Sequence, residues 1–169
     1  MRRLAIGSVA IVLLASLPCE PQETKVGPLT SLRQTRIVVE TLNADAKTLS
    51  LSKKSLESQM FVGLRRDIPR LAVRESAHPS LYLQVTVARV TTLEGQEFGF
   101  SACVSLEMLR PVTILEDVGF GEVTFAQAVV WSKNVLLAGS RTSMRQQVKD
   151  EINEKLTAFA ADYYRQNPQ

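Results

Sequence analysis

The sequence is poor in the side chains on which most metal sites and many catalytic sites depend. Its 169 residues include two cysteines and one histidine, and aromatic residues make up only 6%. Two cysteines cannot form the disulfide framework of a small secreted scaffold. One histidine, with cysteines far apart at positions 19 and 103, also cannot supply the three or four closely spaced ligands that zinc requires. We therefore expect no disulfide scaffold, no metal and no cofactor.

A long hydrophobic run is missing as well, because no stretch reaches the length of about 18 apolar residues that a spanning helix needs. The longest run covers residues 4–17, of which eleven of fourteen are apolar. A helix of that length spans about 21 Å, whereas the bilayer core is about 30 Å thick. The run follows Arg2 and Arg3 and ends at Pro18, as in a secretory signal. We therefore predict a signal peptide over residues 1–19 and export to the periplasm or the medium, with an uncleaved anchor as the alternative.

Cys19 directly follows this leader and is a candidate for the lipid-bearing cysteine of a bacterial lipoprotein. Ser16, Leu17 and Pro18 match the usual acceptor context poorly, because leucine normally stands three residues before the cysteine. Two alternatives stay open. Cys19 has no role near the cleavage site, or it forms a disulfide with Cys103 in an oxidising compartment. Once the leader is removed, only lipidation at Cys19 would tie the protein to a membrane.

An excess of positive charge disappears once the leader is set aside. The whole chain has 20 basic and 17 acidic residues and a pI of about 9.0. Arg2 and Arg3 belong to the leader, which has no acidic residue, so residues 20–169 carry 18 basic against 17 acidic residues. Nucleic-acid surfaces usually join clustered basic residues with exposed aromatic ones. Two clusters of basic residues have no such aromatic residues among them, so we expect no nucleic-acid partner. They are Arg65, Arg66, Arg70 and Arg74, and Arg141, Arg145 and Lys149.

The chain after the leader predicts a short arm and one domain. Residues 20–34 hold prolines and a glycine among polar residues, which indicates an extended arm. Residues 35–166 form the predicted domain. It opens with a β-branched strand over residues 36–42, and a turn follows around residues 43–47.

A first helix is predicted from Ser52, whose hydroxyl can accept a hydrogen bond from the first turn. It ends by Asp67 because Pro69 cannot continue it. Its apolar side chains recur at helical spacing, which indicates one buried face. These residues are Leu56, Met60 and Leu64, with Phe61 beside them. A short strand over residues 71–73 is expected next.

Residues 81–108 show the clearest pattern, a strict alternation of apolar and polar side chains on both sides of a turn at residues 93–96. Period two over both arms predicts an antiparallel hairpin with one face on the core. The apolar set of the second arm runs from Phe98 to Met108. Pro111 predicts a bulge, a bend or an edge position in that arm.

A turn over residues 116–121 and a strand over residues 123–132 are predicted to follow. The chain then closes with an amphipathic helix, for which Ser143 and Gln146 provide a capping-box pattern. The order of elements predicts an α+β two-layer sandwich, a mostly antiparallel sheet with both helices on one face.

Catalytic patterns are scarce. His78 is the only histidine and precedes a proline, which is typical of a turn residue. Glu116 and Asp117 are adjacent within a predicted turn, where solvated charge is expected. Gly119 and Gly121 lie in the same turn, with no helix behind them to receive a phosphate. We therefore expect no catalytic residue. A small hydrolase with a site assembled from His78, Ser105 and Glu107 is the alternative.

Surfaces for partners remain. One strand face consists mostly of small polar side chains and is open to another chain. It includes Ser101, Cys103, Ser105 and Glu107. Sheet edges also accept an added strand. Trp131, together with Phe125, is a candidate interface anchor, although core packing is the more ordinary role of a tryptophan there.

Several segments resemble a family of small exported bacterial proteins of unassigned activity. They are residues 36–46, 81–83, 110–113 and 131–132 (RIVVETLNADA, LYL, RPVT and WS). The resemblance covers most of residues 35–166, holds no catalytic residue and implies a fold and a location only. The order of elements is also similar to that of the lipopolysaccharide-assembly lipoprotein of the outer membrane, without a shared residue motif.

The sequence therefore favours a non-enzymatic exported envelope protein that acts through protein or lipid contacts. A small periplasmic enzyme and a secreted binding or inhibitor module are the alternatives. The oligomeric state does not follow from the sequence.

Overall fold

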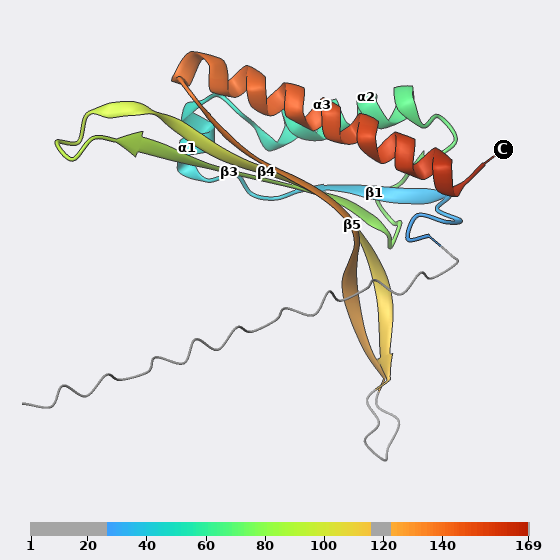
Figure 1. Cartoon of the computed structure of the whole chain (residues 1–169). Coiled ribbons are helices and arrows are strands. Elements are labelled where there is room, and N and C mark those ends of the chain that lie inside the picture. Colours follow the sequence, from blue (N-terminus) through green and yellow to red (C-terminus); the bar gives the residue numbers. More distant parts are fainter. Residues whose placement is uncertain (1–26, 116–122, 169) are drawn as a thin grey trace, which may run out of the picture.

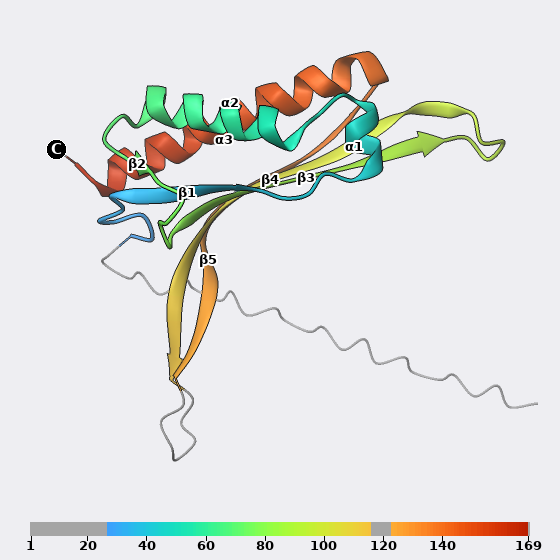
Figure 2. The same ribbon diagram turned by 180° about the vertical axis from the view of Figure 1, so that it is seen from behind.

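One five-stranded sheet carries the structure, a computed structural model that describes residues 27–115 and 123–168. The order across the sheet is β2-β1-β3-β4-β5. The strands are β1 (Gln34–Val39), β2 (Ala72–Val73), β3 (Ser80–Thr91), β4 (Glu97–Leu115) and β5 (Val123–Gly139); the helices are α1 (Ala44–Thr48), α2 (Lys53–Asp67) and α3 (Arg141–Gln166). In both views α2 and α3 lie together over one face of the sheet (Figures 1 and 2). This confirms the predicted α+β two-layer architecture.

The pairing is mostly antiparallel, as predicted. β3, β4 and β5 form an antiparallel meander, whereas β1 runs parallel to both β2 and β3. The predicted β3–β4 hairpin is confirmed, and its turn is closed by hydrogen bonds from Thr92 N–H to the Gln96 carbonyl (2.8 Å) and from Gly95 N–H to the Thr92 carbonyl (2.9 Å). Gly95 has a φ of 82°, which favours glycine at this position.

The core lies between the helices and one face of the sheet. Register places Leu83 opposite Leu106 and Val85 opposite Val104, and all four side chains are buried. The apolar stripes of the two long helices pack on this face. Their buried members include Leu56, Met60 and Leu64 of α2, and Val148, Ile152, Leu156 and Phe159 of α3. Each large apolar side chain fully removed from water contributes about 1.5–3 kcal/mol.

The two long helices begin at serines. Ser52 caps α2 as predicted, because its hydroxyl oxygen accepts a hydrogen bond from Ser55 N–H at 3.2 Å. The prediction for α3 is wrong by three residues: Ser140, not Ser143, is the N-cap, and its hydroxyl accepts from Ser143 N–H. Gln146 does not complete a capping box but donates to Asp150 Oδ1 at 2.7 Å.

Two elements differ from the sequence prediction. The turn expected at residues 43–47 contains the short helix α1, capped by Asn43, whose Oδ1 accepts from Ala46 N–H at 3.2 Å. Strand β5 continues to Gly139, beyond the predicted end near residue 132. The extension pairs with β4 and places the half-buried Val135 and Leu137 on the core face.

The arm expected over residues 20–34 is packed in its described part. Leu29 and Leu32 are almost completely buried. Leu29 N–H donates to Gln166 Oε1 at 2.7 Å, and Asn167 Nδ2 donates to the Leu29 carbonyl at 2.9 Å. Residues 27–33 therefore join the end of α3 to the start of β1.

The β3–β4–β5 meander is longer than the helix layer, and a β-bulge marks each place where it leaves the body. In β4 the register skips Phe98, between the pairs Val90–Gly99 and Thr91–Glu97. In β5 it skips Val130, between Trp131–Met108 and Val129–Leu109. Bulges bend a strand and increase its twist. Beyond the second bulge the β4–β5 ribbon turns away from the helices (Figure 1).

The bend predicted at Pro111 therefore lies close by, at residue 130 of the partner strand. β3 pairs with β4 only as far as Leu109, so Pro111 lies where β4 has β5 as its one neighbour. A proline is tolerated there because the other side of the strand has no ladder to break.

The cap assignment of α3 is testable. Replacing Ser140 by alanine leaves a first-turn amide without its acceptor, so we expect the free energy of unfolding to fall by about 1 kcal/mol. Ser143→Ala is the matched control and should cost less than half as much. Urea unfolding measures both. An equal or larger loss in Ser143→Ala would favour the capping box predicted from the sequence.

Candidate functional site

The three residues of the hydrolase alternative are not assembled. Ser105 and Glu107 are together, with the Ser105 hydroxyl 3.0 Å from Glu107 Oε1. Ser105 pairs with Gln84 in the sheet, whereas His78 precedes β3, six residues earlier. Within β3, the four steps from Ser80 to Gln84 alone span about 13 Å. His78 therefore lies out of reach of the Ser105 hydroxyl, and a serine needs its base within hydrogen-bond distance.

The open sheet face is the side that turns away from α2 and α3. Its centre is polar as predicted, whereas Leu136, opposite Cys103, is an apolar side chain that is 77% exposed on the same face. The central residues are Glu40, Tyr82, Ser105, Glu107 and Asn134. The Ser105 hydroxyl is 2.9 Å from Asn134 Oδ1 as well as near Glu107. One hydroxyl donates one hydrogen, so it bonds either oxygen in turn, or the Asn134 amide is turned to donate.

Tyr82 lies between two carboxylates on this face. The pKa of its phenol is raised, first by partial burial, then by the charge and hydrogen bonding of Glu40, and last by the charge of Glu107. Each cause disfavours a phenolate. The side chains at the centre of this face are therefore neutral or acidic. They can offer hydroxyl, amide and carboxylate contacts to a polar partner.

The two cysteines have different outcomes. Cys103 is exposed on the open sheet face. Cys19 lies outside the described residues, so lipidation, removal and a bridge to Cys103 all stay predictions. The turn with Glu116, Asp117, Gly119 and Gly121 lies outside them too.

The predicted basic clusters make several contacts within the molecule. Arg66 forms a bidentate pair with Asp67, with its Nε and Nη2 at 2.6 and 2.8 Å from the two carboxylate oxygens. Arg70 lies over the rings of Tyr163 and Tyr164 and donates to the Asn167 carbonyl. Arg66 thus pairs with its neighbour at the end of α2, whereas Arg70 contacts the end of α3.

Trp131 is a core residue. Its ring meets that of Phe159 edge to face, with centroids 5.1 Å apart, and its Nε1 donates to Asp162 Oδ2 at 2.9 Å. Burial on the core face and a satisfied indole favour packing over an interface role. Phe125 pairs with Thr113 in the β4–β5 ribbon.

The β3–β4 hairpin places large apolar side chains in water. We call residues 90–99 the hairpin tip. Beyond Phe100 the ribbon consists of β3 and β4 alone, because β5 ends opposite that residue at Gly139. At a rise of about 3.3 Å per residue, the tip extends some 15 Å past the body. Figure 1 shows the hairpin projecting beyond the helices. Leu93 is completely exposed at 109%, and Phe98 is 81% exposed.

Phe98 corrects a sequence prediction. The alternation places it on the core face with Phe100, which is indeed buried. The bulge at Phe98 shifts the register, and no core lies beneath this part of the ribbon. A signal for the tip was present in the sequence: Leu93 is an apolar residue inside a turn, where polar residues and glycine are usual.

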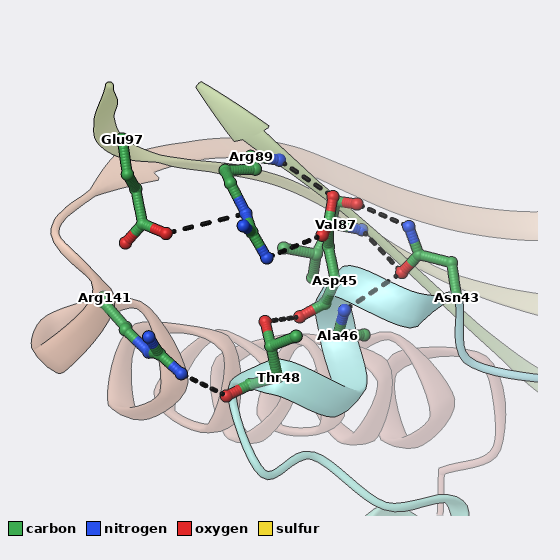
Figure 3. Close-up of polar contacts among 8 residues, drawn as sticks. All are labelled: Asn43, Asp45, Ala46, Thr48, Val87, Arg89, Glu97 and Arg141. Carbon is green, nitrogen blue, oxygen red and sulfur yellow. Dashed lines mark hydrogen bonds and ion pairs between the residues drawn. The ribbon is translucent and has the colours of Figure 1, made fainter. Parts of the chain in front are cut away.

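A polar network holds the base of the hairpin on α1 (Figure 3). Arg89 of β3 contacts Asp45 Oδ1 through Nη2 at 3.5 Å and Glu97 Oε2 through Nε at 3.6 Å. Its backbone N–H donates to Asp45 Oδ2 at 3.1 Å. Asn43 bonds both the N–H and the carbonyl of Val87. Exposed ion pairs contribute less than about 1 kcal/mol each, so the main effect of this network is to fix the direction of the hairpin.

A groove lies near the opposite edge of the sheet, beside β1. This groove of about 530 Å³ runs between β1 and α2 and includes Ile37, Phe61 and Val73 in its lining. β2 pairs with Gln34 and Thr35, so past Thr35 no strand of the described residues lies beside the outer edge of β1. Phe61 is 42% exposed here and belongs to α2, not to the core stripe.

Among residues 27–115 and 123–168, no three His, Cys, Asp or Glu side chains gather as metal ligands would. In the same part of the chain, every helix is too short or too polar to cross a bilayer.

The raised pKa of Tyr82 predicts a pH effect. Folding favours the neutral phenol. The contribution of Tyr82 to the free energy of unfolding is therefore constant below pH 10 and falls as the pH rises through 10 and above. Glu40→Gln removes the larger of the two charge effects, so the Tyr82 pKa should move down toward 10. Phenolate absorbance is measured against pH for the parent protein and for Tyr82→Phe, and their difference gives the titration of Tyr82 alone. The same pair of measurements in the Glu40→Gln background gives the shifted midpoint. A midpoint that stays unchanged in Glu40→Gln would contradict the assignment.

Comparison with known proteins identifies no family. No protein-family model matches the chain, and no curated protein matches its sequence. Among solved structures, the PelC dodecamer from Paraburkholderia phytofirmans is similar at a TM-score of 0.41 and 20% identity, over 78% of this chain and 87% of that one. A homologue of the neuraminyllactose-binding hemagglutinin from Helicobacter pylori has a TM-score of 0.39 and 10% identity, over 79% and 83%. Rare lipoprotein B from Shewanella oneidensis has 0.29 and 12%, over 78% and 91%. The likeness to the lipopolysaccharide-assembly lipoprotein thus reaches the arrangement of the elements only, and TM-scores this low carry no inference about function.

Proposed function

We propose that this chain is an exported, non-enzymatic protein of the cell envelope that acts by binding another protein through its hairpin tip. The observation that carries the proposal is the exposure of Leu93 and Phe98 at the end of a ribbon that the Asp45–Arg89–Glu97 network holds in place. Large apolar anchors supply most of the energy of protein interfaces.

A protein fits the tip better than a lipid surface does. Residues 90–99 include Glu94 and Glu97 and no lysine or arginine. Anionic head groups attract basic segments and repel acidic ones. Protein interfaces, in contrast, combine an apolar centre with a polar, solvent-accessible rim, in which Glu94 and Glu97 can stay hydrated.

The chemistry at Ser105 supports a structural role more than catalysis. Its hydroxyl meets Glu107 and Asn134, and the one histidine of the chain lies about six residues away along the strand. A seryl nucleophile would need Glu107 as its base and a further group to orient that carboxylate. The hydrolase alternative therefore has less support than binding.

The leader supports export. The basic residues at 2 and 3, the apolar run and Pro18 together predict removal of the first residues during secretion. Intact mass measurement on the protein from its own cell should show a chain that lacks the leader. A mass that begins at Cys19 and includes a diacylglyceryl group would make the protein a membrane-tethered lipoprotein. A chain that retains Met1 and is found in the cytoplasm would overturn export.

The tip is tested by photo-crosslinking in the cell that makes the protein. A photoreactive residue in place of Leu93 should form a discrete adduct, whose mass identifies the partner. Val62 on α2 is 61% exposed and provides the matched control position. We expect Phe98→Ser to reduce the Leu93 adduct at least tenfold, because it removes the larger apolar anchor. Equal adducts at positions 93 and 62, or no adduct at 93, would overturn the proposal.

A further inference from the structure

The structure contains a second surface that complements the hairpin tip. We call it the Lys47–Lys53 groove. It is a hollow of about 350 Å³ lined by Thr41, Leu42, Lys47, Leu51, Ser52 and Lys53. Leu42 and Leu51 are buried and form its apolar part. A volume of this size is at the lower end of those that take up a drug-sized ligand, and it is suited to one or two large side chains.

The two surfaces carry opposite charge around an apolar centre. The tip combines Leu93 and Phe98 with Glu94 and Glu97 and has no basic residue. The groove combines two leucines with Lys47 and Lys53 and has no acidic residue in its lining. Complementary charge of this kind selects a partner and its orientation.

The two surfaces lie at the same end of the molecule. Asn43 bonds Val87, and Asp45 bonds Arg89, so α1 and the groove residue Lys47 lie beside the base of the hairpin. Both views show the tip continuing past α1 and away from it (Figures 1 and 2). Because the same network fixes the ribbon in that direction, the tip does not return to the groove of its own chain.

From these observations we infer that the partner of the hairpin tip is a second copy of this chain, whose Lys47–Lys53 groove receives Leu93 and Phe98. Tip and groove at one end allow a two-fold arrangement, in which each copy inserts its tip into the groove of the other. Such an interface is self-complementary and closes as a dimer. The inference rests on the proposed function of the tip and adds the identity of the partner.

Sedimentation velocity on the protein, expressed as the full chain and purified as the cell processes it, measures the dimer. Phe98→Ser should weaken it at least a hundredfold, because two copies each lose a buried aromatic ring. Phe61→Ser makes the same chemical change on α2 and should leave the dimer constant unchanged. A protein that stays monomeric at about 100 μM, a concentration at which even a weak dimer is populated, or a dimer that is insensitive to Phe98→Ser, would overturn the inference.

A charge-reversal pair tests the proposed contact directly. Glu94→Lys and Lys53→Glu, each made in a separate protein, should each weaken self-association at least tenfold, because two symmetry-related pairs become repulsive. Lys53 is the first residue of α2 and only loosely paired with Glu57 at 3.9 Å. A glutamate there also suits the positive end of the helix dipole, so folding should be retained.

Mixing the two variants should restore a dimer of parent-like affinity. In the mixed dimer, the lysine introduced at position 94 of one copy meets the glutamate introduced at position 53 of the other. The second contact pairs the unchanged Glu94 with the unchanged Lys53. Failure to restore association, or restoration of a larger assembly instead of a dimer, would overturn the two-fold contact. If Leu93 in the cell crosslinks to a different protein while the purified chain stays monomeric, the second copy is excluded and the proposed binding role of the tip stands.

Discussion

The antiparallel pairing of β3 with β4 decides which side of the sheet can meet the helices. With Leu83 opposite Leu106 and Val85 opposite Val104, the apolar side chains of both strands share one face. A shift of one residue would turn all of them to water, so burial under α2 and α3 holds the register. The opposite face then receives Tyr82, Ser105 and Glu107 by necessity. Both the core and the open sheet face follow from this one alignment.

The same pairing is longer than the helices that cover it. β4 has 19 residues, whereas only its middle part lies under α3. At each end the ribbon leaves the body at a bulge, Phe98 in β4 and Val130 in β5. Two-stranded ribbons are marginal on their own in water. At the base of the hairpin tip, Arg89 contacts Asp45 of α1, and its pair with Glu97 joins the two strands.

Much of this architecture could be predicted from period and capping. Strict alternation over residues 81–108 is long enough to specify a hairpin, and the stripe from Leu56 to Leu64 with Ser52 before it specifies α2. What failed was short or depended on neighbours. Helix α1 has five residues, too few to show a helical period. Ser140 and Ser143 are both plausible caps, and only the backbone at Ser140, extended at φ −72° and ψ 161°, separates them. The end of β5 and the exposure of Phe98 depend on how far the helix layer extends, which no local pattern contains.

The candidate site was the least accessible part for the same reason. Sequence reasoning weighs residue types, and it therefore turned to His78, Ser105, Glu107 and the cysteines. The structure separates His78 from the other two, and it draws attention instead to Leu93 and Phe98, whose chemistry is ordinary and whose position is not. An apolar residue becomes a binding residue when no core lies beneath it, and only the fold shows where that is.

The nearly neutral charge of residues 20–169 hides a local separation of charge that bears on the proposed association. The tip, residues 90–99, is acidic, and the groove at Lys47 and Lys53 is basic, although 18 basic and 17 acidic residues almost cancel over residues 20–169. Exposed apolar ribbons invite unspecific strand pairing, which acidic side chains beside them oppose. Glu97 is paired with Arg89, so Glu94 is the acidic residue of the tip that can oppose its pairing with another tip. In the proposed contact the same carboxylate faces the lysines around the apolar hollow, so solubility and selectivity would have one physical origin.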